Sequence, residues 1–210
     1  MGKKGLLIVL SGPSGTGKGT LCKELLTRVS GLKYSVSATT REPRQGEIDG
    51  VHYFFMSQGD FREKLAQGEF LEWATVYDNL YGTPRWQVEK TLTEGIDVIL
   101  EIDIQGARQI KEKIPDGVFI FVIPPSFEEL AARIKGRGTD PEEVIRKRLS
   151  AAGLELQYVS EYDYVVINDT VEQAANKLMA IVTAEKCRVK RRMYEFEPLV
   201  KEASDGTALS

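Results

Sequence analysis

Short apolar runs alternate along the chain with stretches whose apolar residues recur at helical spacing. Three continuous apolar runs have the length and composition of buried parallel strands: residues 6–10, 118–123 and 164–167. The remaining periodicity predicts helices over residues 17–29, 87–93, 126–135, 139–158 and 170–194. Strands that alternate with helices predict an α/β fold, with a parallel sheet at its core and helices on both faces.

Two further segments refine this picture. Residues 96–104 alternate, which predicts a strand with Val98, Leu100, Ile102 and Ile104 on one side and Asp97, Ile99, Glu101 and Asp103 on the other. Residues 35–85 combine short strand-like pieces with glycines, aromatics and charges, which is typical of an inserted subdomain. Ligands of parallel sheets bind beyond the carboxyl ends of the strands, so we expect the site near residues 12–18, Asp103 and Asn168.

Capping boxes mark the starts of two of the predicted helices. Ser126 is followed by Glu129, and Thr170 is followed by Gln173. We expect the first of these helices to turn four side chains inward, namely Phe127, Leu130, Ala131 and Ile134. We expect the second to reach about residue 194 without interruption.

The stretch between the first predicted strand and the first predicted helix is rich in glycine. Its residues are Gly12, Pro13, Ser14, Gly15, Thr16, Gly17, Lys18, Gly19 and Thr20. This is the context of a phosphate-binding loop, whose glycines let backbone N–H groups point at an anion while the helix dipole and Lys18 add positive charge. The stretch therefore predicts a site for a nucleoside triphosphate. Gly19 interrupts the usual Lys-Ser or Lys-Thr pair, so we expect Thr20 to reach Mg²⁺ through water.

Composition limits the class of protein. The chain has 210 residues, 42% of them hydrophobic, and a net charge of −3, which suits one globular domain and argues against duplex nucleic acid as a partner. The two cysteines lie far apart, which predicts reduced thiols in a cytoplasmic protein. A single histidine leaves little material for histidine-based metal sites. No apolar stretch is long enough to span a membrane.

Residues 41–81 contain groups that suit a second phosphate. Arg41 and Arg44 could hold a phosphate dianion by charge-assisted hydrogen bonds, and the hydroxyls of Tyr53 and Tyr81 could donate to it. Taken singly, each arginine could be a surface charge and each tyrosine a core aromatic. Their combination behind a phosphate-binding loop favours a site for a second substrate.

Glu72 lies in an apolar setting and suggests which base that substrate carries. Guanine presents N1–H and an N2 amine on one edge, and a carboxylate can accept from both. Adenine would leave the carboxylate unpaired, which costs about 1–3 kcal/mol or more for a charged group. Alone, Glu72 could be a solvated helix residue, but beside the two arginines it predicts selection of a guanine nucleotide.

Longer motifs carry a resemblance to a known family. The block from Ser35 to Phe55 contains Ser-x-Ser-x-Thr-Thr-Arg-x-Pro-Arg-x-Gly-Glu-x-x-Gly-x-x-Tyr-x-Phe, and further motifs start at Glu101, Gly136 and Lys147. Over about residues 5–190 the chain resembles a bacterial guanylate kinase. The resemblance implies a P-loop kinase fold and transfer of the γ-phosphoryl group of ATP to GMP, and we expect dGMP to be phosphorylated as well. It also implies Mg²⁺ as cofactor.

The resemblance assigns roles residue by residue. Guanine would be contacted by Ser37, Glu72, Thr83 and Asp103, and the GMP phosphate by Arg41, Arg44, Tyr53 and Tyr81. Catalysis would rest on Lys18, Arg41, Arg137 and Arg148, the last two on a mobile lid, while Asn168 would lie near the adenine of ATP. Glu101, where the family more often has aspartate, could orient Mg²⁺-bound water.

The resemblance also implies a division of the chain. A kinase domain would span residues 5–186, with core segments at 5–34, 86–133 and 155–195, a GMP-binding subdomain at 35–85 and a lid at 134–154. Residues 196–210 would form a tail. The expected partners are ATP and GMP, with no nucleic acid and no membrane, and a homo-oligomer is left open.

Other functions compatible with the sequence are a non-catalytic module of the same fold, a kinase for another nucleoside monophosphate, and a regulatory nucleotide- or RNA-binding protein. The intact phosphate-binding loop argues against the first, Glu72 against the second, and the acidic balance against the third.

Overall fold

A five-stranded parallel sheet forms the centre of the molecule. The computed structural model describes residues 4–76, 78–136 and 142–204. The strand order is β2-β7-β1-β8-β9, and every neighbouring pair is parallel. The strands are β1 (Leu7–Ser11), β2 (Leu32–Tyr34), β7 (Asp97–Glu101), β8 (Val118–Ile123) and β9 (Tyr164–Ile167). The strands predicted at 118–123 and 164–167 are confirmed.

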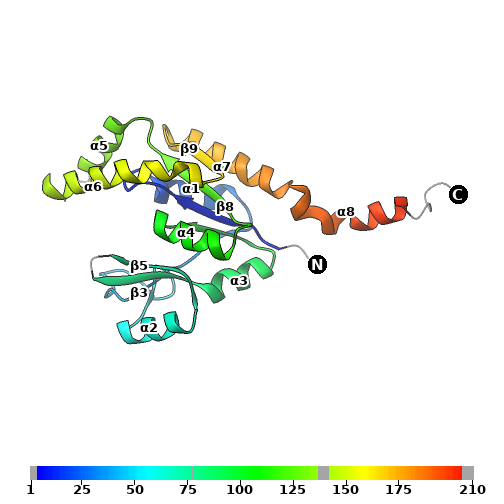
Figure 1. Cartoon of the computed structure of the whole chain (residues 1–210), viewed down its shortest axis with the longest axis horizontal. Coiled ribbons are helices and arrows are strands. Elements are labelled where there is room, and N and C mark those ends of the chain that lie inside the picture. Colours follow the sequence, from blue (N-terminus) through cyan, green and yellow to red (C-terminus); the bar gives the residue numbers. More distant parts are fainter. Residues whose placement is uncertain (1–3, 77, 137–141, 205–210) are drawn as a thin grey trace.

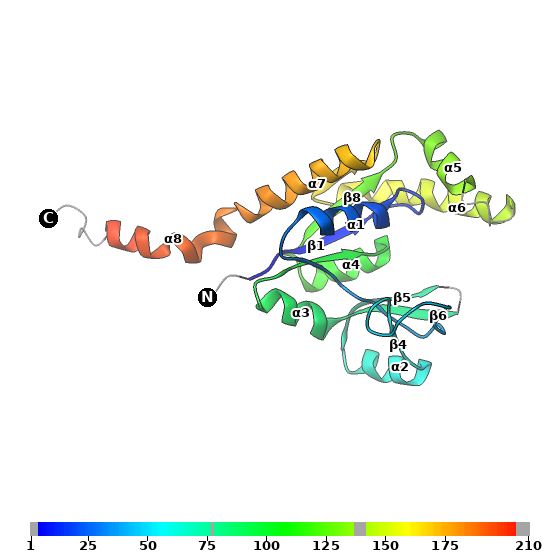
Figure 2. The same cartoon turned by 180° about the vertical axis from the view of Figure 1, so that it is seen from behind.

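Helices cover both faces of this sheet, as predicted (Figures 1 and 2). Alternate residues of β1 point to opposite faces, so Ile8 and Leu10 join one core while Leu7 and Val9 join the other. The first core includes side chains of α1 (Lys18–Arg28) and α7 (Val171–Lys186). The second includes side chains of α3 (Arg85–Thr93) and α4 (Ile104–Lys113). Central β1 is therefore buried throughout and fixes the loop that follows it.

A second sheet has a core of its own. Its order is β4-β3-β6-β5, and it is formed by β3 (Ala38–Thr39), β4 (Phe54–Phe55), β5 (Phe70–Val76) and β6 (Asn79–Pro84). Helix α2 (Gln58–Ala66) packs Phe61 against Phe70, with ring centroids 4.3 Å apart. This body corresponds to residues 35–85, where the sequence predicted an insertion.

Helices α5 (Phe127–Lys135) and α6 (Glu142–Glu155), followed by the short η1 (Leu156–Glu161), form a third unit. Leu130, Ile134 and Ala152 make its small core. Ser126 caps α5 as predicted, accepting from the Glu129 N–H. The inward position predicted for Phe127 is wrong, because this residue is 45% exposed. Figure 1 shows this unit and the second sheet at one end of the molecule, opposite to helix α8.

Two predictions about where an element ends are wrong. The strand predicted to reach Ile104 ends at Glu101, and Asp103 caps helix α4 by accepting from the Gly106 N–H at 2.7 Å. The final helix breaks after Lys186, and α8 (Val189–Ser204) continues through the boundary proposed at residue 195. The cap that Thr170 gives to α7 is confirmed.

Cys22 is buried and Cys187 is exposed, and both are free thiols. Among the described residues, no helix combines the length and the apolar character that crossing a membrane requires.

Candidate functional site

The phosphate-binding loop joins β1 to α1 at the carboxyl end of the central strand. Its glycines have positive φ where the chain curls: 134° at Gly12, 91° at Gly15 and 86° at Gly17. A side chain would strain all three positions. Gly17 is the N-cap of α1, so the first N–H groups of that helix face the concave side of the loop. This geometry suits a bound anion.

Lys18 lies against the loop itself. Its Nζ donates to the carbonyl oxygens of Gly12 at 2.7 Å and Pro13 at 3.0 Å. Burial lowers the pKa of Lys18, while the carboxylates of Glu101 and Glu155 act in the opposite direction. Two anionic groups near the lysine favour its charged form, which a phosphate ligand requires.

Asn168 holds the phosphate-binding loop through its backbone. Its side chain is buried, and Nδ2 donates to the carbonyl oxygen of Thr16 at 2.7 Å. A Cβ at Gly17 would lie 2.5 Å from that nitrogen, so the two residues fit only because position 17 lacks a side chain. Thr16 is buried as well and donates through Oγ1 to the carbonyl oxygen of Pro13 at 2.9 Å. These contacts fix the loop conformation.

A cavity of about 560 Å³ lies over the loop. It is lined by Gly12, Ser14, Gly15, Gly17, Lys18, Gly19, Thr20, Lys23, Glu101, Ile102, Asp103 and Glu155. Of the loop residues predicted to bind ATP, Pro13 and Thr16 are the two that do not line it. The lining combines a lysine and the backbone of the loop with carboxylates, which suits a polyphosphate that carries cations with it.

A second cavity, of about 250 Å³, lies between the main sheet and the smaller sheet. It is lined by Tyr34, Ser37, His52, Tyr53, Glu72, Ala74, Val76, Tyr81, Gly82, Glu101, Ile102 and Asp103. Five residues predicted to bind GMP thus meet here: Ser37, Tyr53, Glu72, Tyr81 and Asp103. The segment from Glu101 to Asp103 lines both cavities, so the two sites share a wall.

Glu72 is the buried acid of the second cavity. It is 6% exposed, and Oε1 accepts from Thr83 Oγ1 at 2.6 Å. Burial raises its pKa to about 7, against the effect of the Thr83 hydrogen bond, and nearby Asp103 adds to the rise. Thr83 does not line the cavity, and its hydroxyl donates a hydrogen bond to Glu72, so it orients the acid.

Arg41 does not line the second cavity, but it is held beside Tyr53, which does. Its guanidinium donates to both oxygens of Glu47, at 3.0 and 2.9 Å, and lies over the ring of Tyr53 at 5.4 Å from the centroid. The hydrogen bonds to Arg41 hold the pKa of Glu47 at about 2. The backbone N–H of Arg44 also donates to Glu47, at 2.7 Å, while the Arg44 side chain is exposed and does not line the cavity.

Helix α6 reaches the phosphate-binding loop. Arg148 donates to Ser14 Oγ at 2.8 Å, although the two residues are 134 positions apart. Arg137, the other arginine predicted for the lid, lies outside the described residues. The structure thus brings one predicted lid arginine to the edge of the phosphate cavity.

Sequence reasoning missed several residues of the site. Glu155 lines the phosphate cavity, and Glu47 holds Arg41. Gly106 leaves room for Glu72, since a Cβ there would lie 2.8 Å from Oε2. The Glu47 pairing had a signal, because an acid six positions after Arg41 in a glycine-rich loop can fold back on it. Glu155 and Gly106 act through contacts that only the folded chain makes.

Comparisons with known proteins agree with this geometry. The family model described as guanylate kinase matches residues 4–185. A guanylate kinase of Desulfitobacterium hafniense is 61% identical over 92% of this chain and 96% of its own length. One from Caldanaerobacter subterraneus is also 61% identical, over 90% and 92%. The crystal structure of guanylate kinase from Anaplasma phagocytophilum has a TM-score of 0.72 at 34% identity and covers 90% of each chain.

Proposed function

The chain belongs to the guanylate kinase family, and from this premise we propose how its two adjoining cavities bind ATP and GMP for phosphoryl transfer. The protein transfers the γ-phosphoryl group of ATP to GMP, with ADP and GDP as products. Such a transfer forms no covalent enzyme intermediate and depends on alignment and on neutralisation of charge. The roles of individual residues follow from their positions around the two cavities.

In this proposal Glu72 selects the base. Its carboxylate, ionised when GMP binds, accepts from N1–H and the N2 amine of guanine, while Thr83 keeps the acid in place. Ser37 and Asp103 line the same cavity and supply further polar groups to the base. Because no step requires a 2′-hydroxyl, we expect dGMP to be a substrate too.

The phosphate of GMP would lie beside Arg41, Tyr53 and Tyr81. Arg41 is already oriented by Glu47 and by its position over the ring of Tyr53, so little conformational entropy is lost when phosphate binds. Arg44 adds a second positive charge from the same loop. The net effect is a site that presents one phosphate oxygen toward the shared wall.

The phosphates of ATP would bind in the concave side of the loop, from Gly12 to Thr20. Lys18 turns from the Gly12 and Pro13 carbonyls to the β- and γ-phosphates. Asn168, expected near adenine, is buried under the loop, so we assign it the role of holding Thr16 in position.

Mg²⁺ fits the donors at this cavity. The hydroxyl of Thr20 and the carboxylates of Glu101 and Asp103 line it, and oxygen donors are the ligands that Mg²⁺ prefers. Among the described residues, no three acidic, histidine or cysteine side chains are disposed as a metal site. When bound, Mg²⁺ neutralises charge on the transferring phosphates. Glu101 and Thr20 would hold its water ligands.

Closure of residues 134–154 would complete the site. Arg148 already contacts the loop through Ser14, and closure would bring it and Arg137 to the transferring group. Their charge stabilises the spread negative charge of the transition state, and the closed lid excludes water as a competing acceptor. The division into core, GMP-binding subdomain, lid and tail, like a cytoplasmic location, stays a prediction.

The shared wall from Glu101 to Asp103 is the observation that carries the proposal, because the two cavities meet along it. The test is ADP release with ATP, Mg²⁺ and either GMP or AMP. Rapid turnover with GMP and little with AMP is expected. GMP binding without ADP release would instead indicate a non-catalytic module, and equal rates with AMP would overturn the role of Glu72.

A further inference from the structure

Strand β5, which carries Glu72, lies at an edge of the second sheet. Its only strand neighbour in the described part of the chain is β6. The other edge of β5 faces helix α4, which Figures 1 and 2 show between the main sheet and the second sheet. An edge strand presents backbone N–H and C=O groups that no neighbouring strand pairs. In β5 these groups meet side chains of α4.

Gln109 of α4 takes the place of a neighbouring strand at Trp73. Its Oε1 accepts from the Trp73 N–H at 3.1 Å, and its Nε2 donates to the Trp73 carbonyl oxygen at 2.9 Å. One amide thus satisfies both backbone groups of one residue, as a residue of an antiparallel neighbour would. Because Trp73 follows Glu72 directly, this pair fixes the backbone next to the acid.

Lys113 extends the contact along the same edge. Its Nζ donates to the carbonyl oxygens of Leu71 at 2.6 Å and Phe70 at 3.2 Å. Leu71 is fully buried, in a core that also contains Ala107 and Ile110 of α4. The residues on both sides of the base-selecting acid are therefore held by one helix.

These contacts come from one face of α4. Gly106, Gln109 and Lys113 follow one another at intervals of three and four residues, which places them on the same side of a helix. Gly106 leaves the space for the Glu72 carboxylate, and Gln109 holds the residue that follows it. The same face thus contacts the side chain of the acid and the backbone beside it.

The pairing of β5 with β6 is irregular at this point. The register of the two strands shifts between Phe70 and Glu72. Where a ladder is disrupted in this way, the strand bends and the aim of its side chains changes. Contacts on the other edge of β5 therefore have a larger part in placing Glu72 than they would beside a regular ladder.

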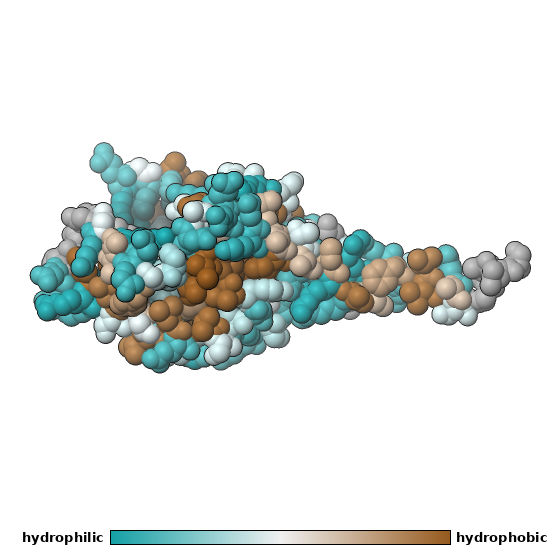
Figure 3. Space-filling view, turned by 90° about the horizontal axis from the view of Figure 1, so that it is seen from above, coloured by the Kyte–Doolittle hydropathy of each residue, from teal (hydrophilic) through white to brown (hydrophobic). Residues whose placement is uncertain are grey.

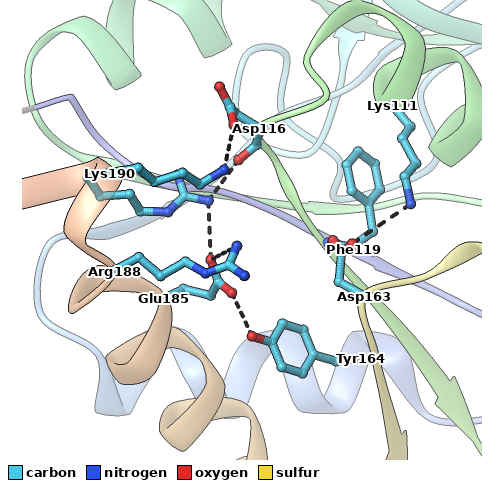
Figure 4. Close-up of polar contacts among 9 residues, drawn as sticks. Lys111, Asp116, Phe119, Asp163, Tyr164, Glu185, Arg188 and Lys190 are labelled. Atoms are coloured by element: carbon cyan, nitrogen blue, oxygen red, sulfur yellow. Dashed lines mark hydrogen bonds and ion pairs between the residues drawn. The ribbon is translucent and has the colours of Figure 1, made fainter.

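The opposite side of α4 is fixed to the main sheet. Lys111 lies over the ring of Phe119 at 5.1 Å from the centroid and pairs with Asp163 at 3.8 Å (Figure 4). Asp163 also accepts from the Phe119 N–H at 2.8 Å, and Arg108 donates to Glu161 at 2.7 Å. Helix α4 is thus tied to the core on one side and to β5 on the other.

We propose that Gln109 is a positioning residue for base selection, which it serves by closing the free edge of β5 at Trp73. Asp103, the N-cap of α4, lines both cavities, so a strand tied to α4 holds Glu72 at a set distance from the shared wall. A carboxylate that must meet two adjacent donors of guanine needs such support, since binding groups have to be held within about 0.5 Å of their productive position. The inference rests on the proposed role of Glu72 and names a contact that maintains it.

A purely structural role for Gln109 is the competing interpretation. An amide that closes an edge strand also stabilises the sheet and prevents another strand from pairing there. That role alone would change the free energy of unfolding and leave KM for GMP and the preference for GMP over AMP as they are. The kinetic constants therefore separate the two interpretations.

Gln109→Met removes both hydrogen bonds and keeps an unbranched side chain that suits a helix. We expect KM for GMP to rise at least about fivefold, as the loss of two neutral hydrogen bonds implies, and the preference for GMP over AMP to fall by a similar factor. KM for ATP should not change. Gln109→Asn, one carbon shorter, keeps at most one of the bonds and should show a smaller rise, so the test stands even where the methionine variant folds poorly.

Two methionine controls separate this contact from the substitution itself. Glu112→Met places methionine at an exposed position of α4, and Lys201→Met places it on α8, which projects from the body of the molecule (Figure 3). Both should match the wild type in KM for GMP. A Gln109→Met protein with unchanged KM for GMP and unchanged preference for GMP would overturn the inference, whatever its melting temperature.

The double variant Glu72→Gln/Gln109→Met shows whether Gln109 acts through the acid. Once Glu72→Gln has removed the carboxylate, the second substitution should change KM for GMP by less than about twofold. A full additional rise would mean that Gln109 affects GMP by another route, and would overturn the inference.

Hydrogen exchange followed by mass spectrometry tests the contact without any activity measurement. Residues 70–76 should exchange faster in Gln109→Met than in the wild type or in Glu112→Met. Unchanged exchange would show that the amide does not hold β5 and would overturn the inference. A wild type that releases no ADP with GMP would instead overturn the proposed function, so the two failures are distinguishable.

Discussion

Gly106 leaves the space that the Glu72 carboxylate occupies. A methyl group at position 106 would lie 2.8 Å from Glu72 Oε2, which is closer than real contacts allow, and 3.2 Å from Cδ, which is a tight contact. The neighbour is the end of a side chain, so it can move, but Thr83 holds it from the other side at 2.6 Å. A side chain at 106 would therefore displace the acid from its partner rather than unfold the protein.

Gly106→Ala should raise KM for GMP about tenfold or more, because a misplaced buried acid loses about 1–3 kcal/mol of hydrogen bonding. KM for ATP and the melting temperature should change little. The control is Gly59→Ala in α2, where the added carbon would lie 3.6 Å from Ser57 Oγ, an ordinary contact. Steady-state kinetics with each substrate varied in turn checks this, and an unchanged KM for GMP in Gly106→Ala would refute it.

The pKa of Glu72 predicts a pH dependence of stability. Burial raises this pKa to about 7 from its ordinary 4.5. Asp103 adds to the rise, while the hydrogen bond from Thr83 and the charge of Lys113 lower the pKa. The native protein therefore holds a proton that the unfolded chain releases between those values. Stability from this group is complete below pH 4.5 and is lost as pH rises to 7, by on the order of 3 kcal/mol. Glu72→Gln, which cannot ionise, should be more stable than wild type at pH 8 but not at pH 4.5, as denaturant titration at both values would reveal.

The same ionisation affects substrate binding. Guanine needs the charged acid, so KM for GMP in the wild type should rise as pH falls below 7. The GMP phosphate titrates in assays of both the wild type and Glu72→Gln, so the difference between their pH profiles isolates the effect of the Glu72 carboxyl. Its KM should be high and its preference for GMP over AMP much reduced. Parallel profiles for the two proteins would contradict this role.

Arg41 and Glu47 should act as one unit. Arg41→Ala removes charge-assisted bonds to the GMP phosphate, each about 1.5–3 kcal/mol, and should raise KM for GMP 10- to 100-fold. Glu47→Gln keeps the charge of Arg41 but removes the ion pair that orients its guanidinium, so we expect a smaller rise in KM for GMP. Because the pKa of Glu47 is about 2, the pair stays ionised at all working pH values. Arg62→Ala, an exposed arginine of α2, is the control and should leave KM as it is.

Gly19 lies against Glu101. A Cβ at this position would be 3.2 Å from Oε2, a contact that a small shift of Glu101 relieves. Gly19→Ser restores the hydroxyl that usually follows the loop lysine, so half-maximal activity should need several-fold less Mg²⁺. Gly19→Ala fills the same space without an oxygen. If both variants respond alike in Mg²⁺ titrations at fixed ATP, the hydroxyl has no part in metal binding.

Patterns within a few residues predicted two of the strands and the starts of two helices. The strands at 118–123 and 164–167 and the capped starts at Ser126 and Thr170 follow from apolar runs and side-chain hydrogen bonds within a few residues. Helix α4 was missed because the alternating strand pattern was extended past Glu101 to Ile104. Asp103, an aspartate that serves as the N-cap of α4, was a signal that a helix begins there. Phe127 follows helical periodicity, yet α5 buries only a narrow face.

Long-range contacts set the limits of prediction at the site. Residues of the 12–20 loop and Asp103 were expected at the carboxyl edge of the parallel sheet, and they line one cavity there. Glu72 comes from β5 of the second sheet and lines the smaller cavity together with Asp103. Two contacts that complete the site join distant residues, Asn168 to Thr16 and Arg148 to Ser14, while the contact of Thr83 with Glu72 depends on the register of the β5–β6 pair. The break before α8 has no glycine or proline signal, and it coincides with the ion pairs of Glu185.

The hydrogen bond from Asn168 to Thr16 spans 152 positions, and it bears on how the protein is made. During synthesis the phosphate-binding loop leaves the ribosome first, yet β1 gains its second neighbour only with residues 118–123 and the loop gains its support only with residue 168. Nucleotide affinity should thus be absent from nascent chains until near the end of translation, and ATP would stabilise only nearly finished molecules.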